Sequence, residues 1–158
     1  MWTSRRAWLA AAPEVVADVG LAVAALPSWH RAVTAIEAPD AVDLRDPLAR
    51  GRITLADRHG QVPGTWRVRR RVRDTVHLEV VTDLGAAIEL LVSCSPWDGG
   101  TAVELGIERA DARGWVAAWD AARRLDASLI ALQRRTSGTR PPVRPAPVAR
   151  TRPVATSG

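Results

Sequence analysis

The chain has 158 residues, of which 47% are hydrophobic and 25% charged, and its formal net charge is +5. This length suits one domain, since folded units cluster near about 100–150 residues and need no disulfide or metal at that size. The single cysteine, Cys94, excludes an internal disulfide framework and a cysteine-rich zinc site. The chain has seven tryptophans but no phenylalanine, tyrosine, lysine or asparagine, so its 22 basic residues are all arginines.

The first part of the chain predicts a strand followed by two helices. The segment 3–11 contains two adjacent arginines and resembles a twin-arginine export signal, but Pro13 and later acidic residues interrupt the apolar stretch that such a signal needs. We therefore expect a strand at 3–11 and a helix over 13–26, with a second, short helix over 28–31. No apolar run reaches the ~18 residues of a membrane span, so we expect a soluble cytoplasmic protein without stable membrane insertion.

From residue 33 onward the apolar period changes to two, which is typical of strands. An acidic, proline-bounded loop over 39–47 separates the first two strands, and the run 96–100 contains the Asp-Gly pair of a tight hairpin. This periodicity predicts six strands, at 33–38, 51–57, 66–73, 76–82, 85–94 and 103–108.

Between 111 and 135 the period returns to 3.6 and predicts a long amphipathic helix. We interpret its apolar stripe as Trp115, Trp119, Ala122, Asp126, Leu129 and Gln133, flanked by Ala118, Leu125 and Leu132. Seven antiparallel strands with one apolar face need a cover, and this helix is the only element long enough to provide it. A curved sheet holding a long helix leaves a space between the two.

The charge is concentrated at the end of the chain. Residues 137–158 contain four arginines and no acid, whereas residues 1–136 contain 18 arginines and all 17 acids. The proline-rich and arginine-rich composition of 137–158 predicts a disordered tail after a single domain at 1–136. The run Arg-Pro-Pro-Val-Arg-Pro also fits a polyproline II ligand, through which the protein would act as an interaction protein.

The nearly neutral body argues against a nucleic-acid partner, which needs a basic face on the domain itself. The alternating arginines of 67–73 are more simply the solvated face of a strand. His77 and Glu79 on the next strand are expected to lie near them, and His59 is expected to be exposed. We interpret Cys94 as a core residue rather than a nucleophile.

Four motifs in this order resemble the START-like superfamily, also known as SRPBCC, which includes polyketide cyclase/dehydrase-like proteins. The resemblance covers residues 3–136. It rests on Ala12-Pro13-Glu14-Val15-Val16 at the first helix, Leu26-Pro27-Ser28-Trp29-His30 at the second, the turn Asp98-Gly99-Gly100-Thr101, and the terminal helix at 115–135.

The resemblance implies an α+β helix-grip fold, in which a seven-stranded antiparallel curved sheet, two short helices and a long C-terminal helix enclose an apolar cavity. It implies binding of a hydrophobic small molecule, such as a polyketide, lipid or quinone. Two roles remain open, a polyketide cyclase/dehydrase-like enzyme and a non-enzymatic carrier or chaperone. We expect no cofactor and no metal, since no phosphate loop or metal-ligand spacing occurs.

Within such a cavity three residues are candidates for catalysis. Arg70, the charged member of an otherwise apolar strand face, would stabilise an enolate oxygen; otherwise it reaches solvent or pairs with Asp126. Asp126, on the tryptophan stripe of the terminal helix, would serve as a general base, unless the stripe is displaced by one position and Asp126 is exposed. His30 would move a proton near neutral pH, although a histidine at a helix junction is often a surface or capping group.

Large apolar side chains are the expected ligand-binding residues. With no phenylalanine or tyrosine in the chain, tryptophans at the predicted walls must supply the bulk, although plain core packing is the alternative for each. The candidates are Trp29, Trp66, Trp115, Trp119 and Leu90.

Overall fold

The computed structural model describes residues 1–38, 44–58, 60–109 and 115–137. Its elements follow the predicted order of one strand, helices, six strands and a long terminal helix. The strands are β1 (Trp2–Leu9), β2 (Val33–Ile36), β3 (Arg50–Asp57), β4 (Gly60–Val72), β5 (Thr75–Thr82), β6 (Ala87–Trp97) and β7 (Gly100–Arg109). The helices are α1 (Pro13–Gly20), the 3₁₀ turn η1 (Val23–Ala25), α2 (Leu26–Trp29) and α3 (Trp115–Thr136).

The seven strands form one antiparallel sheet in the order β1-β7-β6-β5-β4-β3-β2. Each strand from β2 to β6 pairs with the next along the chain, and β1 forms the edge of the sheet beside β7. The β6–β7 hairpin turns at Asp98 and Gly99, both with positive φ, as the Asp-Gly pair predicted. The α+β architecture implied by the resemblance is confirmed.

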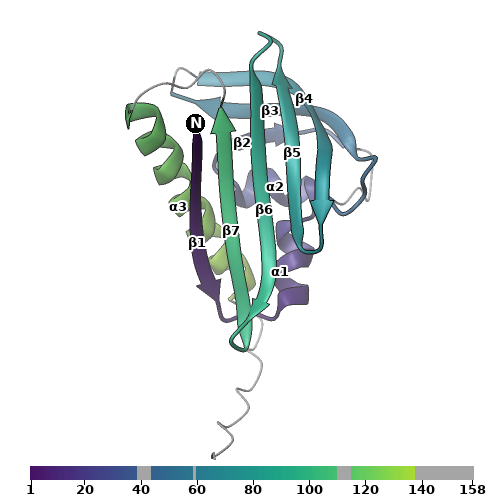
Figure 1. Cartoon of the computed structure of the whole chain (residues 1–158), viewed down its shortest axis with the longest axis vertical. Helices are drawn as coiled ribbons and strands as arrows, with labels where there is room; N and C mark the ends of the chain where they lie inside the picture. The colour runs from purple at the N-terminus through teal and green to yellow at the C-terminus, as the bar shows by residue number, and fades with distance from the viewer. Residues whose placement is uncertain (39–43, 59, 110–114, 138–158) are drawn as a thin grey trace, which may run out of the picture.

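Curvature of the sheet arises in β2, β3 and β4, which turn across the top of the view in Figure 1. The pairing of β4 with β5 shifts register between Val68 and Arg70, a bulge that bends the strand. Two glycines allow close approach of neighbouring backbone. A Cβ at Gly51 would lie 2.1 Å from the carbonyl oxygen of Glu37, and one at Gly64 would lie 2.6 Å from that of Val81.

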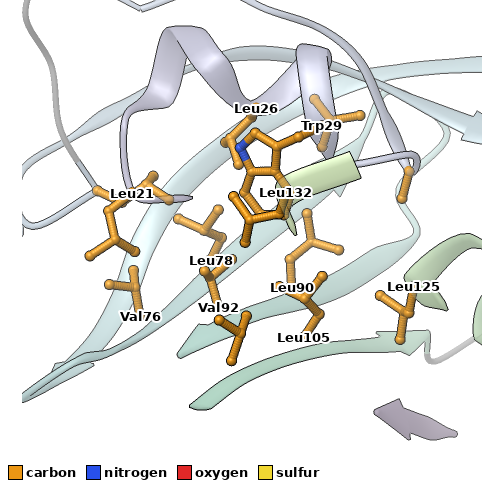
Figure 2. Packing of buried hydrophobic residues seen from close by; sticks show 14 of the residues in the cluster. Leu21, Leu26, Trp29, Val76, Leu78, Leu90, Val92, Leu105, Leu125 and Leu132 are labelled. Atoms are coloured by element: carbon orange, nitrogen blue, oxygen red, sulfur yellow. The ribbon is translucent and has the colours of Figure 1, made fainter. Parts of the chain in front are cut away.

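All the helices lie behind one face of the sheet (Figure 1), where α3 packs on β1 and β7 and contacts α1 and α2. Inward-facing residues of β5, β6 and β7 meet these helices in one apolar core. Figure 2 shows part of it, with Leu78, Val92 and Leu105 from the sheet close to Trp29 and Leu132 from the helices. Every one of these five side chains is buried.

The predicted continuous helix over 13–26 is wrong, because α1 ends at Gly20. The carbonyl of Leu21 accepts a hydrogen bond from the backbone N–H of Leu44, which draws the chain out of the helix. Gly20 itself packs against Cys94, whose Sγ would lie 3.3 Å from an added Cβ. A tertiary contact therefore ends the helix where the apolar period alone continues it.

The helical stripe of α3 is also displaced from the predicted one. Its buried face contains Leu125, Leu129 and Leu132, whereas Trp119 and Gln133 are exposed. The described helix begins at Trp115, so the predicted start at 111–114 lies outside the described residues, as does 138–158 of the predicted tail. The division into a domain and a disordered tail stays a prediction. None of the described helices is both long and apolar enough to cross a membrane.

Candidate ligand-binding cavity

A cavity of about 360 Å³ lies between the inner face of the sheet and the first turns of α3. This volume falls near the lower end of small-molecule sites, which span about 300–1,000 Å³. We name the apolar part of its lining the wall and the charged part the mouth. The wall contains Ala32, Leu55, Ala56, Val62, Ile88, Leu90, Ile107, Ala117 and Ala121, and the mouth contains Asp57, Arg58, Arg109, Asp120 and Arg124.

The cavity exists because α3 changes the size of its inward side chains along its length. Ala117 and Ala121, one turn apart, line the cavity, whereas Leu125 and Leu129 on the following turns are buried in the core. A methyl group leaves space beneath the sheet that a leucine fills. The N-terminal half of α3 therefore roofs a cavity, and its C-terminal half closes the core.

Two ion pairs occupy the mouth. Asp57, at the end of β3, lies 3.4 Å from Arg109, at the end of β7, although β4, β5 and β6 separate these strands in the sheet. The curvature of the sheet brings them together. On α3, Arg124 Nε donates a hydrogen bond to Asp120 Oδ2 at 3.0 Å. All four side chains are at least two-thirds buried.

Neither a protein-family model nor a curated protein matches this chain. Several solved structures are similar to it. A START superfamily protein from Mycobacterium smegmatis is similar over 87% of this chain and 97% of its own, with a TM-score of 0.68 and 14% identity. The major latex-like protein 151 from Panax ginseng is similar over 86% of this chain and 97% of its own, with a TM-score of 0.63 and 10% identity. The protein has a START-like fold.

A third similar structure is DynU16, a putative protein in the dynemicin biosynthetic locus. It covers 89% of this chain and 48% of its own, with a TM-score of 0.64 and 11% identity. At these identities the likeness shows the START-like fold alone, and the residues of this chain must carry any argument about its function.

The predicted position of Arg70 on the inner face of its strand is wrong. Val68 pairs with Leu78, but Arg70 pairs with His77, so the bulge at Arg69 moves Arg70 to the outer face. Arg70 is exposed and does not line the cavity. The prediction assumed that side chains alternate strictly between the two faces of the strand, and the one extra residue at the bulge breaks this alternation.

The predicted position of Asp126 between sheet and helix is wrong for a similar reason. Its side chain is 55% exposed and lies 3.2 Å from Arg5 of β1, at the rim of the α3–β1 contact. The buried stripe of α3 is rotated by about one residue from the predicted one, which is the alternative that the sequence left open. Asp126 does not line the cavity.

His30 is buried but lies outside the cavity lining. Its Nδ1 accepts a hydrogen bond from the backbone N–H of Ala32, and Nε2 has no partner among the described residues. Burial lowers the pKa of His30 to about 4, although a backbone hydrogen bond partly opposes this shift, so the ring is neutral at pH 7. His30 is therefore a neutral, buried residue outside the cavity lining, and its role in moving a proton stays a prediction.

The predicted ligand-binding residues separate into three groups. Leu90 lies in the cavity wall. Trp29 and Trp66 are buried outside that wall, and Trp66 borders a second, more open hollow between β3 and β5. Trp119 is 59% exposed, with the guanidinium of Arg123 lying 5.4 Å from its ring centroid. The side chain of Trp115 lies outside the described residues, as does His59.

Arg67 and Arg69 of β4 lie on the outer face, where acids of β5 and β6 pair with them, whereas Arg71 pairs in register with the buried Val76 and donates a hydrogen bond to the carbonyl oxygen of Arg45. Arg67 forms an ion pair with Glu79, and Arg69 Nη1 lies 3.0 Å from Glu89, which also contacts His77. This confirms the predicted proximity of the histidine and glutamate to the arginine row. On the inner face, burial and then the charge of Asp74 raise the pKa of Cys94 to about 12, which leaves the thiol unreactive.

Sequence reasoning missed the charged mouth and the alanines of α3. Ala117 and Ala121 precede Leu125 on the same helical face, and this change from small to large residues could have been recognised in the sequence. The pairing of Asp57 with Arg109 left no signal, because it depends on sheet curvature. No three potential metal-ligating side chains come together in the described part of the chain.

Proposed function

We propose that this protein binds a hydrophobic small molecule in the cavity beneath α3. The observation that carries the proposal is the apolar wall, in which Leu55, Ile88 and Ile107 of the sheet face the small residues Ala117 and Ala121 of the helix. Such a wall binds ligands by removing apolar surface from water, at about 25 cal/mol per Å².

Of the two roles left open by the sequence, the arrangement favours a carrier or chaperone of a lipid or quinone over a polyketide cyclase/dehydrase. Neither Arg70, Asp126 nor His30 lines the cavity, so the proton-transfer scheme built on them has no access to a ligand. A cyclase-like activity would have to use the mouth residues instead.

Binding can be tested with N-phenyl-1-naphthylamine, a neutral probe whose fluorescence rises in apolar surroundings. The variant Ala121→Leu places a larger side chain in the cavity and should weaken probe binding about tenfold or more, about 1.4 kcal/mol, because the leucine occupies volume that the probe needs. The matched control is Ala127→Leu, the same change on the exposed side of the same helix, which should leave binding unchanged. Equal affinity of the two variants, or no binding by the native protein, would contradict the proposal. Native mass spectrometry of the purified protein should also detect a co-purifying hydrophobic ligand.

A further inference from the structure

The charged lining of the cavity contains both signs. Among its described residues are three arginines and two aspartates, a formal sum of one positive charge beside an apolar interior. Arg109 occupies the inner face of β7, one pleat beyond the wall residue Ile107, and Arg124 lies less than one turn of α3 beyond the wall residue Ala121. Cationic groups therefore border the apolar wall on both the sheet side and the helix side.

Arg124 is the arginine best placed to meet a ligand. Its side chain is 24% exposed, and its one ion-pair partner among the described residues is Asp120, reached through Nε. A guanidinium has five N–H donors, so this contact leaves the planar fork of its two terminal nitrogens for a second anion. A carboxylate engages that fork with two parallel hydrogen bonds, as a phosphate also does.

The surroundings strengthen such a contact. Arg124 adjoins apolar wall on one side and water on the other, and an ion pair beside low-dielectric surface is screened less than a pair on an open face. The neighbouring Arg123 differs from Arg124 in its surroundings. It is exposed, lies over the ring of Trp119 and does not line the cavity. The two arginines are neighbours in sequence and lie on different faces of α3.

We propose that the cavity selects amphipathic anions, with the apolar chain of the ligand against the wall and its carboxylate bound by Arg124 at the mouth. This inference rests on the proposed binding function and names its ligand class. The size of the cavity suits an aliphatic or small ring-containing acid rather than a large lipid with two chains.

The test compares decanoate with 1-decanol, which share a ten-carbon frame and differ in the charged head. Both should displace N-phenyl-1-naphthylamine from the native protein, and decanoate should bind about tenfold more tightly at low ionic strength, as expected for a charge-assisted hydrogen bond. In Arg124→Gln this preference should fall to about twofold while decanol binding is retained. Arg123→Gln should keep the full preference, and thermal unfolding should show both variants folded.

Several outcomes would overturn the inference. Equal binding of decanoate and decanol to the native protein would do so, as would a loss in Arg124→Gln that affects both compounds alike. Failure of decanoate to displace a bound probe would also overturn the carboxylate site while leaving the cavity as a neutral binding site. If the probe, decanol and decanoate all failed to bind, the proposed function would fall together with the inference.

Discussion

The space beneath the sheet has two ends, and side-chain size distinguishes them. At the closed end, Trp29 of α2 and Leu132 of α3 meet Leu78 and Val92 of the sheet, and all four side chains are buried (Figure 2). At the open end, the helix presents alanines to the sheet and a cavity remains. The same sheet and the same helix therefore form a packed core and a cavity within one layer.

This difference assigns stability to the closed end and the proposed ligand binding to the open end. Removing a methylene from a close-packed core removes packing contacts and lowers the free energy of unfolding. Side chains that line a cavity already lack packing partners on one side. Substitutions at the closed end should therefore affect the free energy of unfolding most, and substitutions at the open end should affect ligand affinity most.

The largest expected effect is at Trp29. Trp29→Ala should lower the free energy of unfolding by about 3–5 kcal/mol, because it leaves a void in the closed end. Urea unfolding followed by circular dichroism measures the change. Trp97→Ala, at a tryptophan that is 68% exposed, should stay within about 0.5 kcal/mol. A loss below about 1 kcal/mol for Trp29→Ala would show that the closed end is not packed as described.

The next effect concerns pH and His30. Its pKa is lowered to about 4 in the folded protein from 6.5, so the unfolded chain takes up a proton first as the pH falls. Stability from the neutral ring is intact above about pH 6.5 and decreases by about 3 kcal/mol as the pH approaches 4. Unfolding at about pH 7 and about pH 4 should show a smaller acid-induced loss in His30→Gln than in the native protein. Equal losses in the two would contradict burial of His30.

The smallest effect is expected at the cavity wall. Leu55→Ala should cost about 2 kcal/mol, near the lower end of the range for such truncations, because this side chain borders space that is already open. Leu132→Ala makes the same change at the closed end and should cost clearly more. Similar costs at both positions would mean that the two ends are packed alike, and the comparison would fail.

The regularly patterned parts of the chain are the parts whose structure could be predicted from the sequence. Hydrophobic periodicity determined the order of the elements and the buried faces of β5, β6 and β7, because a one-residue slip in these regular strands would expose their whole apolar set. The Asp-Gly pair at 98–99 likewise determined its hairpin through local backbone geometry.

Tertiary structure alone decided the details of the site. The bulge in β4 moved Arg70 to the outer face, and no local signal in an alternating run of arginines and valines marks where such a bulge falls. The face of α3 was ambiguous because alanines occur around the whole helix, so packing against the sheet had to select Leu125 over Asp126. The composition, basic and without lysine, determined that every permanently cationic side chain is an arginine. Tertiary packing decided which arginines border the cavity, because the curvature of the sheet brings Arg109 to Asp57 and the docking of α3 on the sheet places Arg124.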